Sequence, residues 1–373
     1  MKYYIIAGEA SGDLHASNLM KELKALDQDA RFRFWGGDRM LAQGGEIVKH
    51  IREMSFMGFW EVMLNLRTIL KSLEMCRKDI LLWKPDALIL VDYPGFNLRM
   101  ATFAKAHGIR VIYYISPQIW AWKQSRIKRI KQVVDKMLVI LPFEQAFYRR
   151  FGMEVDFTGH PLVDALEEFK STSLLPDFLQ KNGLNEVPIV ALLPGSRKVE
   201  LASNLRTMAS LAKHFPEFQF VVAAVRSYPE SYYQKIIKGS SVKIVTGQTY
   251  HLLSHSRAAL VASGTATLEA ALLGVPQIVC YRAGKISYFI VKQLVKVKFI
   301  SLVNLIADRQ LVQEMIQHRF NSANLKNELS RLLQDIDYVK EIREGYQQMY
   351  MKLGGSGASR KAANIVHSYL TGN

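Results

Sequence analysis

The amino-acid sequence predicts an α/β protein made of two doubly wound, Rossmann-like domains, and three observations support this prediction. Short apolar runs alternate with helical patterns along both halves of the chain, as expected for parallel sheets flanked by helices. The chain has 373 residues, which is long for one domain and sufficient for two. A stretch with several prolines and glycines, residues 158–188, separates the two series and is the predicted linker.

The first series predicts a parallel sheet that binds ligands at the carboxyl ends of its strands. The expected strands cover residues 3–7, 31–35, 86–92, 110–115 and 136–141. A helix is expected over residues 14–26, after the first strand, and a long helical pattern covers residues 58–83. The first loops to inspect for function are therefore those that follow residues 7 and 92.

The second series predicts a similar sheet, with strands near residues 189–193, 219–224, 242–245, 258–262 and 277–281. After residue 301 the pattern is helical to the C-terminus. We expect the domains to comprise residues 1–165 and 166–349, with a terminal helix over residues 350–373 completing the first domain. The two domains are expected to face each other across a cleft.

Residues 258–282 predict a strand, a tight turn, a helix and a second strand. Gly264 permits the turn, Ser263 or Thr265 can cap the helix, and Gly274 ends it in a left-handed conformation. The turn directs free backbone N–H groups and the positive end of the helix dipole at one spot. A phosphate or diphosphate suits that spot.

A second turn in the same half of the chain, Pro194-Gly195-Ser196-Arg197, also follows an expected strand. Gly195 and Ser196 allow close backbone approach, and Arg197 offers a forked cation for a diphosphate. A surface turn with a solvated arginine is the alternative. Glu269, one turn into the helix of the previous stretch, could accept hydrogen bonds from two ribose hydroxyls or could simply be solvated.

The loop at residues 8–13 is rich in glycine but lacks the G-x-G-x-x-G pattern, so a dinucleotide dehydrogenase loses its main support. Glu9 and Asp13 place negative charge where a pyrophosphate would need backbone amides. We interpret the loop as a binding edge for a hydroxylated or cationic group, or as a capped tight turn.

Asp92 ends a strand that is otherwise apolar. A carboxylate in this position lies where ligands bind, and partial burial can raise its pKa into the range of a general base. The alternative is a turn-forming residue before Tyr93-Pro94-Gly95. His160, at the predicted linker, is best explained as a hinge residue with a local hydrogen bond.

The net charge of +16 favours an anionic partner: nucleic acid, acidic lipid headgroups or phosphorylated substrates. Residues 119–131 and 286–300 mix aromatic or apolar side chains with cations, and residues 54–60 add an apolar patch. Such segments suit an anionic membrane surface, single-stranded nucleic acid, or a core face with a solvated basic face. No apolar run reaches 18 residues, the apolar N-terminus is too short for a signal peptide, and Cys76 and Cys280 lack metal-ligand spacing.

Several segments occur in the order seen in the lipid A disaccharide synthase family, which the chain resembles over nearly its whole length. They are Gly8-Glu9-Ala10-Ser11-Gly12-Asp13, Ser116-Pro117-Gln118-Ile119-Trp120-Ala121-Trp122, Gly159-His160-Pro161-Leu162-Val163-Asp164, Leu193-Pro194-Gly195-Ser196-Arg197, Ser263-Gly264-Thr265-Ala266-Thr267-Leu268-Glu269 and Asn304-Leu305. The resemblance implies a GT-B fold and transfer of 2,3-diacylglucosamine from its UDP conjugate to 2,3-diacylglucosamine 1-phosphate (lipid X). The implied product is a β-1,6-linked disaccharide, with UDP released and neither cofactor nor metal required.

The same resemblance assigns roles to individual residues. Asp92 would be the catalytic base, in a first domain that receives the acceptor. Gly95 stands where some family members carry an acidic residue, which removes a second carboxylate but leaves Asp92 in place. Glu9 is a second catalytic candidate and, like Asn304, falls on a functionally important motif. The candidates for UDP-sugar binding, in the second domain, are Gly195, Ser196, Arg197, Ser263, Gly264, Thr265, Glu269, Arg282 and Asn304.

The resemblance also implies a location and partners. The family acts in lipopolysaccharide biosynthesis at the cytoplasmic face of the inner membrane of Gram-negative bacteria, so we expect peripheral binding to an anionic membrane, no nucleic acid, and association into a homodimer. A UDP-N-acetylglucosamine 2-epimerase or a transferase to another lipid acceptor is the nearest alternative enzyme. A basic RNA-binding module is the alternative from another class, supported by charge and by the aromatic-basic segments.

Overall fold

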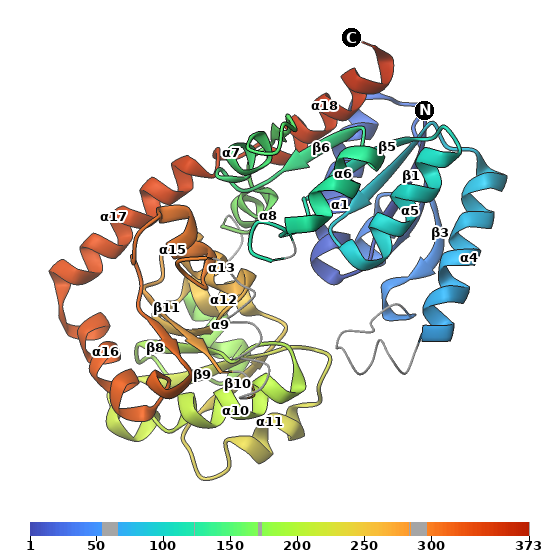
Figure 1. Cartoon of the computed structure of the whole chain (residues 1–373). Coiled ribbons are helices and arrows are strands. Elements are labelled where there is room, and N and C mark those ends of the chain that lie inside the picture. Colours follow the sequence, from blue (N-terminus) through green and yellow to red (C-terminus); the bar gives the residue numbers. More distant parts are fainter. Residues whose placement is uncertain (54–65, 123, 171–173, 283, 285–296, 373) are drawn as a thin grey trace. The chain divides into compact units, whose positions relative to one another are not determined.

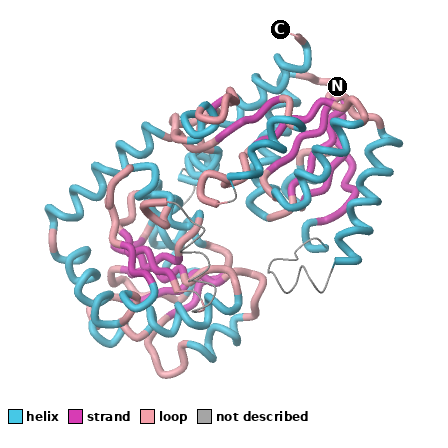
Figure 2. The backbone as a smooth tube through the Cα atoms, viewed as in Figure 1, coloured by secondary structure: helices cyan, strands magenta, loops and turns pink. Residues whose placement is uncertain are grey.

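The computed structural model describes the chain except for residues 54–65, 123, 171–173, 283, 285–296 and 373 (Figure 1). It divides into two compact units: unit 1 comprises Met1–Asp164 and Leu353–Asn373, and unit 2 comprises Ala165–Lys352. In each unit the strands form one layer and helices flank it (Figure 2). The prediction of two Rossmann-like domains is confirmed.

Unit 1 contains a seven-stranded parallel sheet in the order β3-β2-β1-β4-β5-β6-β7. Its strands are β1 Lys2–Ala7, β2 Arg31–Gly36, β3 Glu46–His50, β4 Ala87–Val91, β5 Arg110–Tyr114, β6 Lys136–Val139 and β7 Asp156–Phe157. Its helices are α1 Ala10–Leu26, α2 Asp38–Ala42, α4 Leu66–Trp83, α5 Pro94–Ala106, α6 Ile127–Val133, α7 Glu144–Arg149 and α18 Ala358–Thr371. The edge strands β3 and β7 are not among the predicted strands.

Unit 2 contains a six-stranded parallel sheet in the order β10-β9-β8-β11-β12-β13. Its strands are β8 Ile189–Leu193, β9 Gln219–Ala224, β10 Lys243–Thr246, β11 Ser256–Ala262, β12 Gln277–Tyr281 and β13 Glu314–Ile316. Its helices are α9 Leu175–Asn182, α10 Lys198–Ala209, α11 Glu230–Ile236, α12 Thr249–Ser254, α13 Thr265–Leu272, α15 Leu302–Ala307, α16 Ser322–Gln334 and α17 Ile336–Lys352. The strand β13 interrupts the stretch that was expected to be helical after residue 301.

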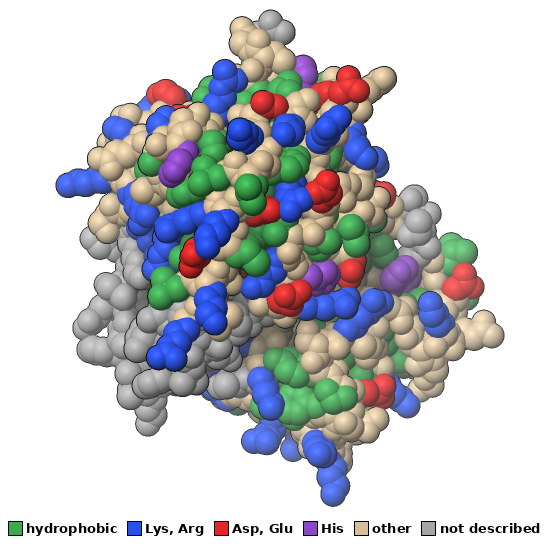
Figure 3. Space-filling model, turned by 90° about the vertical axis from the view of Figure 1, so that its right-hand side faces the viewer, with side chains coloured by type: hydrophobic (Ala, Val, Ile, Leu, Met, Phe, Trp, Pro, Cys, Tyr) green, Lys and Arg blue, Asp and Glu red, His purple; other side chains and the backbone are tan. Residues whose placement is uncertain are grey.

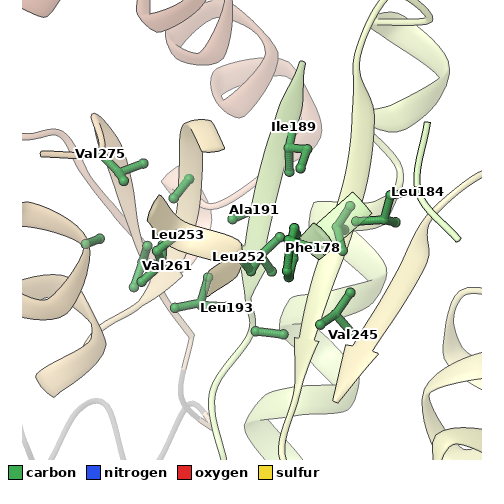
Figure 4. Close-up of a cluster of buried hydrophobic side chains, with 14 of the residues drawn as sticks. Phe178, Leu184, Ile189, Ala191, Leu193, Val245, Leu252, Leu253, Val261 and Val275 are labelled. Atoms are coloured by element: carbon green, nitrogen blue, oxygen red, sulfur yellow. The ribbon is translucent and has the colours of Figure 1, made fainter. Parts of the chain in front are cut away.

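The core of unit 2 shows why the central strands read as continuous apolar runs. Strand β8 is buried along its whole length, as expected for a strand covered on both faces. On one face Ile189, Ala191 and Leu193 belong to a buried cluster that includes Phe178 of α9 and Leu252 of α12 (Figure 4). The strand order reverses beside this strand, between β8 and β11, and beside β1 in unit 1, between β1 and β4. At such switch points doubly wound sheets bind ligands, next to the carboxyl ends of the strands.

The predicted linker, residues 158–188, is largely helical, although its prolines and glycines are typical of a connecting segment. Helix α8 covers Pro161–Lys170, and α9 follows it. Pro161 and Pro176 both lie in the first turn of a helix, where proline is tolerated because its missing N–H would have no helical partner.

The C-terminal helix α18 belongs to unit 1, where it packs against α1 (Figure 1). Asp164 accepts hydrogen bonds from the backbone N–H groups of Gly357 (2.6 Å), Ala358 (3.3 Å) and Ser359 (2.9 Å), and so caps the start of this helix. Asp164 is the last residue of the first segment of unit 1, so these hydrogen bonds join that segment to the second one, Leu353–Asn373.

Candidate active site

The switch point of unit 1 brings Glu9 and Asp92 together. Ala7, the last residue of β1, pairs with Val91, the last residue of β4, so the loops that follow these two strands start side by side. The charge of Glu9 is close enough to raise the pKa values of Asp92 and Tyr93. Two carboxyl groups thus share the edge of the sheet where the sequence predicted ligand binding.

Asp92 has a backbone conformation that the surrounding residues enforce. Its φ angle is 45° and that of Tyr93 is 48°, a left-handed region that costs non-glycine residues on the order of 1–3 kcal/mol each. The carbonyl oxygen of Asp92 accepts hydrogen bonds from the hydroxyl of Tyr113 (2.6 Å) and the side-chain amide of Asn97 (2.7 Å). Its backbone N–H donates to the carbonyl of Tyr114 (3.2 Å). The start of this loop is therefore pinned from three sides.

The carboxyl group of Asp92 has the properties of a base that works near neutral pH. Burial, followed by the nearby charge of Glu9, raises its pKa to about 6, and the backbone N–H of Tyr93 opposes this shift. The residue remains partly exposed, so a substrate hydroxyl can approach it. A carboxylate with a raised pKa accepts a proton more readily than an ordinary aspartate does.

Gly8 leaves room for the loop that carries Asp92. A Cβ atom at Gly8 would lie 2.3 Å from Cγ of Tyr93, so the tyrosine ring lies directly against the glycine backbone. The same ring stacks on Phe96, with 5.8 Å between centroids. Ring packing therefore couples the loop after β1 to the loop after β4.

The rest of the segment at residues 8–13 differs from the expected binding loop. Helix α1 begins at Ala10, four residues earlier than predicted. Asp13 is buried and accepts hydrogen bonds from the backbone N–H groups of Gly37 (2.7 Å), Met40 (3.1 Å) and Arg39 (3.2 Å). Its charge organises the start of α2 rather than a ligand edge, whereas Glu9 remains at the edge.

His160 lies outside this group of residues and is buried in unit 1. Its Nδ1 accepts a hydrogen bond from the N–H of Leu162 (3.2 Å), and its ring meets that of His15 edge-on. Burial lowers the pKa of His160 to about 3 and that of His15 to about 4, so both rings are neutral at physiological pH.

The switch point of unit 2 brings the two predicted diphosphate turns together. Leu193 at the end of β8 pairs with Val261 in β11, and a Cβ atom at Gly195 would lie 3.5 Å from that of Ala262. The φ angle of Gly195 is 104°, which strongly favours glycine. The turns after β8 and β11 are thus neighbours.

Arg197 and Ser196 are exposed at this edge. Arg197 Nη1 lies 3.2 Å from Glu200 Oε1. An exposed pair of this kind contributes about 0–1 kcal/mol, so the guanidinium can exchange its partner for an anionic ligand at little cost.

The turn after β11 is built differently from the expectation in one respect. Neither Ser263 nor Thr265 is the N-cap of α13, because Gly264 occupies that position and has no side chain to accept from the helix start. The hydroxyl of Ser263 instead donates to the carbonyl of Ile300 (3.0 Å). Gly264 and Thr265 are exposed, so the first N–H groups of α13 face a position that a ligand can reach. Gly274 ends the helix with a φ angle of 74°, as predicted.

Glu269 lies one helical turn beyond this position and is partly buried. Burial raises its pKa to about 7, and a hydrogen bond from the hydroxyl of Tyr250 (3.4 Å) opposes the shift. The carboxyl group therefore titrates near neutral pH, so it can accept from, or donate to, a hydroxylated ligand.

Asn304 and Arg282 are engaged with protein groups. Asn304 is fully buried, and its side-chain amide is bonded to the segment at residues 311–314. The guanidinium of Arg282 donates to Thr207 Oγ1 (3.3 Å) and to the carbonyl of Phe320, over whose ring it also lies. Both residues tie elements of unit 2 together.

Comparison with known proteins decides the family. A family model described as lipid-A-disaccharide synthetase matches residues 3–368. The lipid-A-disaccharide synthase of Syntrophus aciditrophicus is 40% identical over 367 residues, covering 96% of this chain and 95% of the relative. The chain belongs to the lipid-A-disaccharide synthase family. The enzyme of the same name from Myxococcus xanthus is 39% identical over 373 residues, covering 98% and 97% of the two chains. The resemblance of the motifs is confirmed, and the chain is a UDP-sugar-dependent glycosyltransferase.

Solved structures share the fold of this lipid-A-disaccharide synthase family member. A UDP-GlcNAc 2-epimerase from Neisseria meningitidis, bound to UDP-GlcNAc, superposes with a TM-score of 0.64 at 16% identity and covers 100% of both chains. The glycotransferase of kitacinnamycin superposes with a TM-score of 0.67 at 13% identity and covers 99% of each chain. At such low identity these superpositions show the fold alone, and they confirm the prediction of a GT-B fold.

Sequence reasoning missed two residues that contact the motif residues, Tyr250 and Glu144. Tyr250 supports Glu269 from another helix, and no local pattern signals that contact. Glu144 is buried and accepts hydrogen bonds from Ser116 and from the backbone of Leu141 (2.9 Å). The only signal for this contact was that Ser116 opens one of the family motifs.

The face of the molecule drawn in Figure 3 carries many cations interleaved with apolar side chains. In α6, Ile127, Ile130 and Val133 are buried while Lys128 and its neighbouring cations are exposed. Residues 54–60 and most of residues 286–300, the other segments singled out for mixed character, lie outside the described residues. Among the helices that the structure describes, none combines the length and apolar character needed to cross a bilayer.

Proposed function

We propose that this chain performs its family's reaction with Asp92 as the general base. It condenses UDP-2,3-diacylglucosamine with lipid X and yields the β-1,6-linked lipid A disaccharide 1-phosphate and UDP. The observation that carries the proposal is the position of Asp92 beside Glu9 at the switch point of unit 1, where burial, followed by the charge of Glu9, raises the pKa of Asp92 to about 6. Unit 1 is thereby assigned the acceptor and unit 2 the UDP-sugar donor.

In the acceptor half of the reaction, the 6-hydroxyl oxygen of lipid X attacks the anomeric carbon of the donor. The new C–O bond forms as the bond from that carbon to the diphosphate breaks, with inversion, and the hydroxyl proton passes to Asp92. The pinned backbone of Asp92 fixes the direction of its carboxyl group. Burial, and after it the charge of Glu9, raises the pKa of Asp92 and so strengthens it as a base.

In the donor half of the reaction, the leaving UDP gains negative charge on its β-phosphate. Arg197 and the first backbone N–H groups of α13 stabilise this charge, since both are exposed at the switch point of unit 2. Gly195 and Ser196 admit the phosphate oxygens to the backbone, and the carboxyl group of Glu269 binds the ribose hydroxyls. Ser263, Gly264, Thr265, Asn304 and Arg282 shape this subsite.

The test is mass analysis of the products after the purified protein is mixed with UDP-2,3-diacylglucosamine and lipid X. The expected product is the disaccharide 1-phosphate together with UDP. A parallel reaction with unacylated UDP-GlcNAc separates the alternatives, because a 2-epimerase converts that nucleotide sugar without an acceptor. Epimer formation in the absence of the disaccharide would refute the proposed function.

The acylated substrates place the enzyme at a membrane, and we assign it a peripheral position on the cytoplasmic face of the inner membrane. The exposed cations of α6, Lys128, Arg129 and Lys131, supply an electrostatic attraction to anionic lipid, while the apolar side of the same helix is core. Binding to anionic vesicles should weaken as salt rises. Equal partition onto neutral vesicles at all salt concentrations would contradict this attraction. Light scattering tests the expected homodimer.

A further inference from the structure

A buried polar network in unit 2 joins residues 300–304 to the first residue of β13. Ser301 and Asn304 are fully buried, and Glu314 is 8% exposed. Charged side chains are rarely buried without partners, so a glutamate at this depth has to be explained by its contacts.

Glu314 accepts four hydrogen bonds through its carboxylate. One oxygen accepts from the backbone N–H of Ile300 (3.0 Å). The other accepts from the backbone N–H (3.0 Å) and hydroxyl (2.7 Å) of Ser301 and from the side-chain amide of Asn304 (2.9 Å). The carboxylate therefore fixes the backbone of Ile300 and Ser301 directly.

Asn304 has no hydrogen-bonding capacity left for a ligand. Its Nδ2 donates to Glu314 (2.9 Å) and to the carbonyl of Val312 (2.9 Å), and its Oδ1 accepts from the N–H groups of Leu311 (2.8 Å) and Val312 (3.0 Å). A primary amide offers two donors and two acceptor positions, and all four are used. Asn304 thus acts through the network rather than by touching substrate.

The network leads to the turn after β11. The carbonyl of Ile300, whose N–H is held by Glu314, accepts the hydrogen bond from the hydroxyl of Ser263 (3.0 Å). Ser263 immediately precedes Gly264, the N-cap of α13. The contacts therefore run from Glu314 through Ile300 to Ser263, next to the exposed start of this helix.

We propose that Glu314 is a positioning residue for the nucleotide diphosphate at the start of α13. By holding Ile300 it keeps Ser263 and the first N–H groups of α13 in the geometry that receives the diphosphate. The proposal rests on the proposed function, in which the donor binds at this turn. It assigns Asn304 the same indirect role, because its side chain donates to Glu314 and its backbone N–H donates to the hydroxyl of Ser301 (3.3 Å).

The test is UDP titration of the Glu314→Gln variant. A glutamine oxygen can satisfy the three donors of Ser301 and Asn304, but its NH₂ group then faces the N–H of Ile300, which loses its acceptor. Leaving one buried donor unpaired should weaken UDP binding by about tenfold, with the KM for lipid X unchanged. Glu328→Gln is the matched control, since Glu328 is equally buried in unit 2 but contacts Tyr338 and Arg331.

A double-variant cycle separates positioning from general loss of stability. Ser263→Ala removes the hydroxyl that reaches Ile300, so adding it to Glu314→Gln should weaken UDP binding no further. Fully additive losses, or unchanged UDP affinity in folded Glu314→Gln, would overturn the proposal. If Glu314→Gln does not fold, Ser301→Ala takes its place, and unchanged UDP affinity in that variant counts equally against it. Wild-type protein that fails to bind UDP refutes the proposed function itself.

Discussion

After β4 and β5, beside the switch point of unit 1, left-handed backbone positions are held by Asp92, Tyr93 and Ile115, whereas the turn after β8, at the switch point of unit 2, holds its left-handed position with Gly195. The first edge forces large side chains into a costly conformation and fixes them with buried hydrogen bonds. The second edge leaves open backbone beside an exposed cation. The difference fits the proposed division of labour, in which unit 1 aims one carboxyl group and unit 2 admits the diphosphate oxygens to its main chain.

The largest effect that this comparison predicts is the loss of turnover in Asp92→Asn. The amide cannot accept the proton of the acceptor hydroxyl, so kcat should fall by about 10²–10⁴-fold. UDP affinity should stay near wild type, because the change is confined to unit 1. Steady-state kinetics and UDP titration measure the two quantities.

Asp86→Asn is the matched control for this variant, since Asp86 is exposed at the other end of β4 and accepts from the backbone of Lys2. It should leave turnover intact. Wild-type turnover in Asp92→Asn would remove Asp92 from the role of base and would break the contrast between the two edges.

A smaller effect, on UDP binding instead of turnover, is predicted for Arg197→Ala in unit 2. Losing a charge-assisted contact to the diphosphate should weaken UDP binding by roughly tenfold or more, whereas the loss of the exposed contact to Glu200 should barely change stability. Calorimetric titration with UDP provides the measurement. Arg206→Ala, an exposed arginine further along α10, is the control, and equal losses in both variants would show only a diffuse effect of charge.

The smallest effect is a shift in pH dependence in Glu9→Gln. Below its pKa of about 6, Asp92 is protonated and cannot act as a base, so kcat/KM should fall as the pH falls through that value. The charge of Glu9 favours the protonated form. Removing it should lower the pKa of Asp92 and move the acid limb of the profile to lower pH. An acid limb that stays in place would mean that the two carboxyl groups do not interact.

The strands that flank both switch points are predictable from sequence because they are buried on both faces and read as apolar runs. Strand β4 (Ala87–Val91) and strand β8 (Ile189–Leu193) illustrate this, since every residue in both is buried. The loops after such strands contain glycine, proline or a carboxylate, and parallel topology brings these loops to one edge. The positions of Asp92 and Arg197 follow from that logic alone.

The sequence does not reveal strands that are poorly buried or very short, nor contacts between residues that are far apart in the chain. Strand β3 (Glu46–His50) has no fully buried residue, and β13 (Glu314–Ile316) is three residues long, so neither shows a strand pattern. Helix α1 includes Asp13, whose backbone partners lie near Gly37, after the next strand. The four contacts of Glu314 have the same long-range character.

The placement of α18 has a consequence for biosynthesis. A nascent chain that has grown only to Lys352 contains every strand of both sheets, yet the surface of α1 that α18 covers is still bare. The unit made first by the ribosome is thus finished last, after all of unit 2 has been translated. During that interval the partly built N-terminal half exposes apolar surface, and truncation of the chain after Lys352 would leave that surface permanently without its cover.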